Sequence, residues 1–493
     1  MMMMMMMNKK KKRRKKKKKK KKKQKVNRIQ IKRKFISCER KRKREREREK
    51  ENILNMNQTH IDFVAQLKNA GKFWYIVNPF ETTFELPHQV PDYQQQIWIP
   101  FFFLIILEQV ILTAKNKKKS FRLNDQVTSF SHWIFQESGR IFFRGAEYYT
   151  YIKIYENYHQ WNLSWNSIWT WYITALGVDF CYYWVHRSNH EVHFLWAHHQ
   201  VHHSSEEFNL AVGLRQSVLQ HWCNFIFYLP LAFFIPPSHF IVHHQFNLIY
   251  QLWIHTTIIN DLGPLELIFN TPKHHRVHHG CNLYCLDKNY GGVLIIWDRL
   301  FGTFMEEKDE LIYGLVTSPR SFNPLYLQTF YAKAMIEKSK SMKSSANKLS
   351  VLWKGPSWYP GGPRLGLDKY KINVTSRTKY NIRIPTWQSV YISLHFLIIF
   401  YKHLQLYNNE KQDINNFVGI TILNNIFALI VIGLLFDKSE YAELVELVRC
   451  IVYLFISYED CCLNVLIHYI YIISCFIWIF QVVHQMKTNL LRL

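Results

Sequence analysis

Long apolar segments alternate with polar segments along the chain, and this pattern predicts a helical membrane protein. Residues 97–114 are apolar over a length that crosses a bilayer as a helix. Residues 164–185 are apolar and aromatic and lead directly into a polar region. Residues 218–235 and 240–259 are apolar again and are separated by two prolines. These last two segments predict a helical hairpin that enters and leaves the membrane.

The C-terminal part of the chain contains further apolar segments that we interpret as membrane anchors, at 387–400, 417–436, about 448–456 and 463–483. Lysines at 115 and 117–119 directly follow the first apolar segment, which places that end in the cytosol by the positive-inside rule. Glu108 is the one acidic residue inside that segment, so it should face protein rather than lipid. The fold class expected is an all-α polytopic membrane protein with a cytosolic-facing, histidine-rich helical domain.

Polar segments set the expected domain boundaries. We expect a basic, low-complexity tail at 1–55, a membrane domain containing the histidine-rich region at 73–305, a polar cytosolic linker at 306–385 and C-terminal transmembrane helices at 386–485. The hairpin formed by 218–259 explains how polar residues near 275 return to the same side of the membrane as those near 190. The exact number of membrane spans stays open.

Charge changes this picture only at the N-terminus. Residues 9–52 hold 28 Lys and Arg and five Glu, a net charge of +23, whereas the whole chain carries +28. Such a segment buries no core and should be disordered. It could bind nucleic acid or anionic lipid. We favour the interpretation that this segment is translated from nucleotides upstream of the true start codon. No nucleic-acid partner is therefore expected. The tail has no apolar core of a signal peptide.

Histidines gather in three clusters. In an α-helix, residues i, i+3 and i+4 share one face, so each cluster would project its imidazoles in one direction. Eight imidazoles are too many for one metal ion with an open position but suit two ions. Imidazole binds iron, zinc, copper and nickel, so the ligands alone do not choose the metal. The clustered residues are His186 and His190, then His199, His202 and His203, and finally His275, His278 and His279.

Other histidines provide the contrast. The chain has 24 His, and isolated ones are usually ordinary core or surface residues. His198 and His274 precede ligand candidates by one position, about 100° away around a helix. We therefore expect them to point elsewhere; the alternative is that each takes the place of its neighbour, His199 or His275, as the ligand.

Glu191, directly after His190, invites comparison with zinc proteases. Those enzymes need H-E-x-x-H, in which the second His lies four residues after the first, whereas His193 lies three residues after His190. His193 therefore does not occupy the position of the second His in that motif, and we exclude a zinc protease. Glu191 remains a candidate catalytic residue that orients a metal-binding imidazole, with a solvated surface carboxylate as the equal alternative.

The order H-x-x-x-H, H-x-x-H-H, H-x-x-H-H resembles the fatty acid hydroxylase superfamily of membrane di-iron oxygenases. Flanking residues are similar to its alkylglycerol monooxygenase family. Residues 179–191 match D-x-x-Y-Y-W-x-H-R-x-x-H-E, and 202–209 resemble H-H-S-S-E-x-Y-N with Phe208 in place of Tyr. Leu214-Arg-Gln-Ser217 and Trp297-Asp-Arg-Leu-Phe-Gly-Thr303 are also similar. The resemblance covers about 73–366 well.

This resemblance implies two iron ions, a further ligand at His255, and tetrahydrobiopterin as reductant. It also implies an endoplasmic reticulum membrane enzyme with its active site facing the cytosol. The enzyme would use O2 to hydroxylate the ether-linked carbon of a membrane alkylglycerol or lyso-ether lipid, releasing a fatty aldehyde and glycerol. Tyr359-Pro-Gly-Gly362 lacks the His of the cytochrome b5 motif H-P-G-G, so no fused haem domain is expected. No residue shows a pterin site independently.

Two alternatives stay open at this point. One is another membrane di-iron hydroxylase, acting on a sterol, sphingoid base or fatty acyl chain. The other is a non-catalytic metal-binding or metal-transport membrane protein. A transporter places its histidines along a path inside the membrane spans, whereas these clusters lie mostly just outside the spans.

Overall fold

The computed structural model describes residues 69–115, 122–408, 416–456 and 465–490. The basic tail expected at 1–55 lies outside the described residues. Within these ranges the regular elements are helices, and β pairing is confined to two isolated bridges, Phe269 with Leu294 and Gly280 with Tyr313. The expected all-α class is therefore confirmed for the described part of the chain.

The described α-helices are α2 (Tyr93–Ala114), α3 (Leu123–Tyr158), α4 (Ile168–Glu191), α5 (His193–His199), α6 (Gln220–Phe225), α7 (Pro237–Trp253), α8 (Pro272–His279), α9 (Ile296–Leu300), α10 (Pro324–Lys340), α11 (Ser345–Trp353), α12 (Thr386–Asn408), α13 (Asn416–Phe436), α14 (Ala442–Ile456) and α15 (Val465–Leu490). Short 3-10 helices connect them: η1 (Asn69–Trp74), η2 (Pro79–Glu81), η3 (Pro87–Gln89), η4 (His202–Ser204), η5 (Leu210–Leu214), η6 (Ile226–Phe233), η7 (Gly263–Leu267), η8 (Leu283–Cys285) and η9 (Asp368–Tyr370).

Three helical segments in the described ranges are long and apolar enough to cross a membrane: Pro87–Ala114, Val418–Phe436 and Val465–Thr488. They coincide with three of the apolar segments expected from the sequence. Glu108 on α2 is buried, accepts a hydrogen bond from the Leu210 backbone N–H at 2.8 Å, and accepts another from the Thr256 hydroxyl at 2.5 Å. The prediction that Glu108 faces protein is confirmed.

The hairpin expected at 218–259 differs from two plain helices. Its first arm is divided between α6 and η6, because Pro230 lies within η6, lacks a backbone N–H and crowds the preceding turn. Its second arm is α7, which starts at Pro237, where a missing N–H costs no helical hydrogen bond. Most of α7 is buried by protein, including His243 and Asn247, so this helix has a polar and covered environment.

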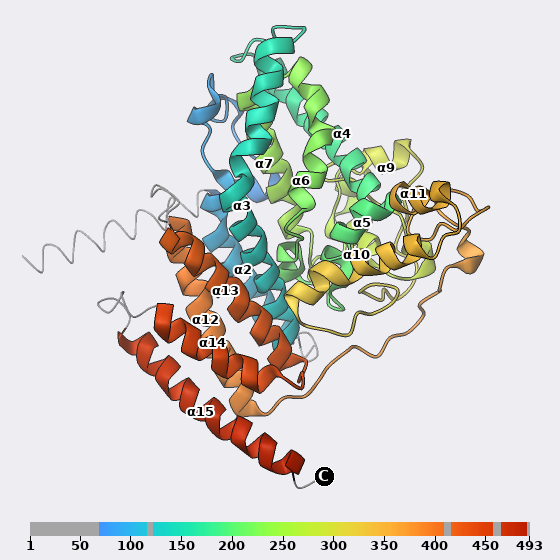
Figure 1. Ribbon diagram of the computed structural model, residues 1–493. Coiled ribbons are helices and arrows are strands. Elements are labelled where there is room, and N and C mark those ends of the chain that lie inside the picture. Colours follow the sequence, from blue (N-terminus) through green and yellow to red (C-terminus); the bar gives the residue numbers. More distant parts are fainter. Residues whose placement is uncertain (1–68, 116–121, 409–415, 457–464, 491–493) are drawn as a thin grey trace, which may run out of the picture. The chain divides into compact units, whose positions relative to one another are not determined.

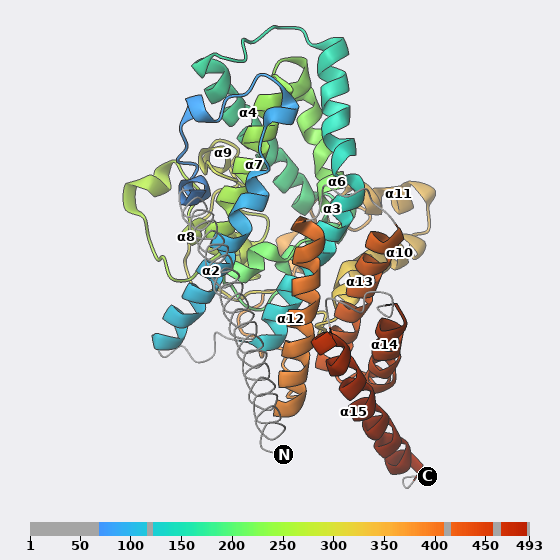
Figure 2. The same cartoon turned by 90° about the vertical axis from the view of Figure 1, so that its left-hand side faces the viewer.

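A group of helices around the long α3 positions the histidine-rich region. α4 packs against α5, α7 and η6, while α2 packs against α7. The C-terminal helices α12 to α15 lie together beside α3, to which α12 and α13 pack (Figure 1, Figure 2). Trp133 of α3 contacts Phe400 and His403 of α12 with ring centroids 5.8 and 5.1 Å apart. The C-terminal anchors are thus joined to α3 by aromatic packing.

The segment expected to be a polar linker, 306–385, contains α10 and α11, and both pack against α5. The Gln200 amide donates to the Leu327 carbonyl at 2.9 Å, and the His193 backbone N–H donates to the Lys354 carbonyl at 2.9 Å. The polar composition of this segment did not reveal the packing. Helices that cover others from the outside are at most amphipathic, so their sequences look polar overall. The segment supports the second histidine cluster. The domain boundaries themselves stay a prediction.

Candidate metal centre

The three histidine clusters come from different kinds of local structure. His186 and His190 lie near the C-terminal end of α4, and His275, His278 and His279 lie on α8 as the spacing predicts. The second cluster differs from the expected single helix. α5 ends at His199, and the tighter turn η4 carries His202 and His203. The three histidines of this cluster therefore do not lie on one continuous α-helix.

The structure brings all nine predicted histidines together, in two groups. The donor atoms within each group lie within 4.8 Å of one another, and all nine side chains are buried. One group is His186, His190, His199, His203 and His278, and the other is His202, His255, His275 and His279. Each group therefore draws on more than one cluster, and His255 at the end of the α7 arm joins the second group.

Nitrogen-to-nitrogen distances within the groups fit metal coordination. The Nε2 atoms of His186 and His199 are 3.2 Å apart, as are those of His199 and His203. In the second group, the Nε2 atom of His255 lies 3.2 Å from that of His202 and 2.9 Å from that of His275. A first-row metal ion binds imidazole nitrogen at roughly 2.1 Å, so neighbouring ligands at right angles are ~3 Å apart.

Backbone carbonyl oxygens fix the protons on the opposite ring nitrogens. The Nδ1 atom of His202 lies 3.2 Å from the Arg215 oxygen, and that of His255 lies 2.8 Å from the Gln251 oxygen. A carbonyl oxygen only accepts, so Nδ1 carries the proton and Nε2 carries a lone pair. The two facing Nε2 lone pairs of His202 and His255 repel each other unless a cation lies between them. His186 and His278 are held the same way, by the carbonyls of Tyr290 and Lys288 at 2.9 Å.

Burial keeps these imidazoles neutral. Burial lowers the pKa of His186 to about 4, and burial together with neighbouring imidazoles lowers the pKa of His190 and His203 well below the ordinary value. The Nε2 atoms of His190 and His278 are buried without a hydrogen-bond partner. Neutral, convergent and unpartnered imidazole nitrogens are the donor set that a pair of iron ions would use. The residues present therefore fit a di-iron centre.

Two aspartates hold the loop that carries the Tyr290 carbonyl. Asp298 accepts the backbone N–H groups of Tyr290 and Gly291 at 2.8 and 2.7 Å. Asp179 of α4 accepts the Val293 N–H at 2.8 Å and the Trp297 indole N–H at 2.9 Å. A Cβ at Gly291 would lie 2.5 Å from the Leu294 carbonyl oxygen, so only glycine fits there. This loop therefore sets the orientation of His186.

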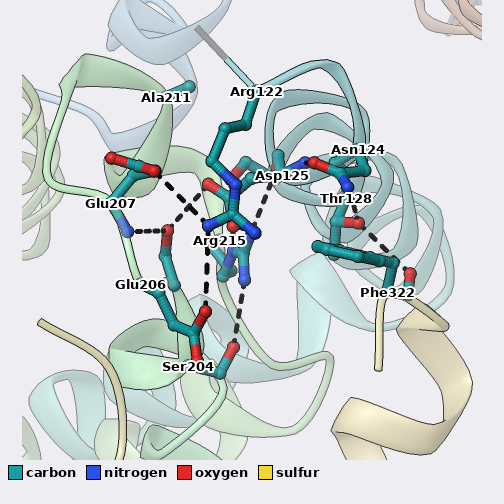
Figure 3. Close-up of polar contacts among 12 residues, drawn as sticks. Arg122, Asn124, Asp125, Thr128, Ser204, Glu206, Glu207, Ala211, Arg215 and Phe322 are labelled. Atoms are coloured by element: carbon teal, nitrogen blue, oxygen red, sulfur yellow. Dashed lines mark hydrogen bonds and ion pairs between the residues drawn. The ribbon is translucent and has the colours of Figure 1, made fainter. Parts of the chain in front are cut away.

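Arg215 holds the turn of the second histidine cluster through its side chain and its backbone carbonyl (Figure 3). Its buried guanidinium pairs with Asp125 of α3 at 2.7 Å and donates to the Ser204 hydroxyl at 3.3 Å. Its backbone carbonyl accepts the proton of His202. Glu206 and Glu207, on the same loop, pair with Arg122 at 3.8 and 3.3 Å. These pairs tie the turn that carries His202 and His203 to the start of α3.

Glu191 does not reach an imidazole in the contacts the structure describes. Its carboxylate pairs with Arg187 at 2.8 Å and with Arg364, which also donates to the Glu191 carbonyl at 3.1 Å. A catalytic role for Glu191 stays a prediction, and these contacts show it joining α4 to the segment after α11.

The neighbours of the clustered histidines point elsewhere, as expected. The His198 ring packs against Phe194 with centroids 5.3 Å apart, and the His274 ring packs against Phe304 at 5.4 Å. Neither belongs to the two groups of potential ligands. Cys281 and Cys285 are buried free thiols outside both groups.

A cavity reaches the centre from the helical bundle. Its inner end is lined by His199 of one group and by His202 and His255 of the other. Apolar residues such as Trp98 and Leu252 and polar residues from α3 and α6 line the remainder, and the cavity volume is about 100 Å³. A small molecule in this cavity would contact imidazoles of both groups at once.

The comparisons with known proteins agree with this geometry. The model of the fatty acid hydroxylase family matches residues 171–303. The chain is 43% identical over 398 residues to an alkylglycerol monooxygenase of Xenopus tropicalis, covering 80% of this chain and 89% of that protein. The chain belongs to the alkylglycerol monooxygenase family. It is 44% identical to the Homo sapiens member over 385 residues, 77% of this chain and 86% of that protein. With the Danio rerio member it shares 42% identity over 403 residues, 80% of this chain and 89% of that protein. No solved structure gives a significant match.

Family membership, the apolar helices and the histidine groups together identify a membrane monooxygenase whose centre fits two irons. Sequence reasoning missed the partners of the imidazoles. The carbonyls of Tyr290, Lys288 and Arg215 carry no side-chain signal, since any residue supplies a carbonyl. The amide of Gln220, which lies 3.0 Å from the His199 Nδ1 atom, was also missed. Its spacing from the histidines follows no motif.

Proposed function

We propose that the protein is a tetrahydrobiopterin-dependent alkylglycerol monooxygenase of the endoplasmic reticulum membrane, with its centre facing the cytosol. Its substrate is an alkylglycerol or lyso-ether lipid. The observation that carries the proposal is the cavity lined by His199, His202 and His255, because a substrate carbon bound there would face imidazoles of both groups. The relatives' printed name supplies the substrate class.

The reaction balances with one O2 and one pterin. One oxygen atom enters a C–H bond of the carbon next to the ether oxygen. The other oxygen atom leaves as water, with two electrons and two protons from tetrahydrobiopterin, which becomes a dihydrobiopterin. The hydroxylated ether then breaks its C–O bond to give a fatty aldehyde and glycerol. Iron, held by the nine histidines, would supply the O2 activation that imidazole alone cannot.

The chain's own residues provide position and shielding. The carbonyls of Tyr290, Lys288, Arg215 and Gln251 keep the ring protons away from the centre, so each Nε2 atom faces inward. Every imidazole is buried by protein, so a substrate that fills the cavity would exclude bulk water from the centre. A dry centre prevents the reducing equivalents from being lost to solvent before the substrate carbon is in place.

A direct assay tests this function. Membranes containing the protein, supplied with an alkylglycerol, O2 and tetrahydrobiopterin, should release fatty aldehyde, and omission of the pterin should stop release. Purified protein should hold about two irons per chain, one for each histidine group. Stoichiometric zinc without iron in active protein would contradict the oxygenase assignment. Aldehyde formation with another reductant, but not with the pterin, would contradict the cofactor assignment alone.

A further inference from the structure

The cavity at the metal centre continues into a second one toward the surface. The two share residues from three helices, namely Gln94 on α2, Arg140 on α3 and His244 on α7. The second cavity is lined further out by Val218 and by Trp222, which is 42% exposed on α6. Together they form a path from the outside of α6 to the imidazoles, and α6 borders it throughout.

The face of α6 toward this path carries polar atoms without partners. Gln220 and Asn224 both line the cavity, and the Gln220 Oε1 and Asn224 Oδ1 atoms are buried without a hydrogen bond. The side-chain amide of Gln220 lies 3.0 Å from His199 Nδ1. Only one of its two polar atoms, nitrogen or oxygen, makes this contact, so the other has no hydrogen-bond partner in either orientation of the amide. A buried polar atom without a partner costs about 1–3 kcal/mol, which a bound hydroxyl group would remove.

Gln220 and Asn224 project from the same side of α6, so both side chains can reach one small polar ligand. Gln220 and Asn224 are four residues apart on one helix, so they lie on one face about one turn, roughly 5.4 Å, from each other. Of the two, Gln220 is the residue whose amide contacts a histidine of the centre, His199.

We propose that the Asn224 Oδ1 atom accepts the proton of the terminal hydroxyl of the glyceryl headgroup while Gln220 binds the inner hydroxyl, and that this pair sets the preference for glyceryl ethers. The inference rests on the proposed function. It places the ether-linked carbon beside His199, His202 and His255 and the two hydroxyl groups along α6. The alkyl chain then leaves the centre past apolar residues such as Trp98 and Trp133, which line the same cavity.

The test compares two substrates of equal chain length, an alkylglycerol and the alkyl ether of ethylene glycol, which lacks the terminal hydroxyl. The wild type should prefer the alkylglycerol. Asn224→Leu should lower kcat/KM for the alkylglycerol roughly tenfold, mainly through KM, and leave the glycol ether unchanged. Asn224→Asp, which keeps an acceptor oxygen, should retain the preference. Cys223 precedes Asn224 on α6 but lines neither cavity, so Cys223→Ala should have the kcat/KM of the wild type for both substrates.

Each outcome separates this inference from the proposed function. A wild type inactive on every ether lipid contradicts the proposed function. A wild type that is active, with Asn224→Leu slowing both substrates equally at unchanged iron content, overturns the headgroup subsite alone. A raised KM for tetrahydrobiopterin with an unchanged KM for the lipid overturns it as well, because the path would then bind the pterin. If Asn224→Leu does not fold, Asn224→Ala takes its place in the same comparison.

Discussion

The metal centre and the network around Arg449 in the C-terminal bundle both bury polar side chains, but they satisfy them differently. In the C-terminal bundle, the Arg449 guanidinium pairs with Glu446 on α14 at 2.5 Å, donates to the Tyr471 hydroxyl at 2.9 Å, and donates to His395 at 3.0 Å. His395 in turn bonds the Ser474 hydroxyl at 2.9 Å. This network joins α12, α14 and α15 through partners that the chain itself provides.

The metal centre has no such closure among its described contacts. Imidazole nitrogens of His190 and His278 are buried without partners, and lone pairs face one another at His202 and His255. An unpaired buried polar group is costly, so a protein keeps such groups only where something else pairs with them. The difference teaches that a buried network in which the polar groups pair with one another indicates a structural role, whereas several convergent imidazole nitrogens without partners indicate a bound ligand. The following predictions test this contrast.

Removing a ligand should have the largest effect. His199→Ala and His275→Ala should each abolish aldehyde formation and lower iron content, since each removes an Nε2 atom from a group. His198→Ala and His274→Ala should keep both, because those rings pack against Phe194 and Phe304 instead. Paired iron analysis and aldehyde assays on the four variants provide the measurement. Loss of activity at 198 and 274 with retention at 199 and 275 would show that the ligand assignment is shifted by one residue.

Removing the support of a ligand should have an intermediate effect. Asp298→Ala leaves the Tyr290 and Gly291 N–H groups unpaired and loosens the carbonyl that orients His186. We expect iron affinity or turnover to fall about 10–100-fold. Asp298→Asn keeps one acceptor oxygen and should recover part of the loss. Iron titration and turnover measure this effect, and full activity in the alanine variant would show that the loop does not position His186.

Breaking the saturated network should change stability but not chemistry. Arg449→Leu leaves Glu446 buried without its cation, which should cost about 3–5 kcal/mol of unfolding free energy. Thermal unfolding of the detergent-solubilised protein measures the loss. Iron per folded chain and kcat should stay at the wild-type level. A variant that loses iron at unchanged stability would place Arg449 in the functional site and remove the contrast between the two regions.

Deleting the tail should have the smallest effect. A chain without residues 1–55 should keep its turnover and its membrane association, since that segment holds neither apolar spans nor clustered histidines. Aldehyde assay and membrane fractionation of both chains make the comparison. Loss of targeting on deletion would assign the basic segment a role at a membrane surface.

Much of the fold could be predicted from apolar length, and the exceptions have local causes. Spans at 97–114, 417–436 and 463–483 were recognised because a bilayer demands long uninterrupted apolar helices. The hairpin at 218–259 was recognised only in outline, since Pro230 divides its first arm and protein covers its second. The packing of α10 and α11 on α5 left no trace in the polar composition of 306–385.

The sequence by itself determined which histidines could act together, because helical spacing fixes the direction of neighbouring side chains. His275, His278 and His279 share a face of α8 for this reason. Only the tertiary structure decided that His278 joins His186 while His275 and His279 join His202 and His255. Membership of a group depends on which helices converge. The same holds for the carbonyls that fix each ring proton and for the cavity bordered by α6, because backbone atoms and empty space have no sequence pattern of their own.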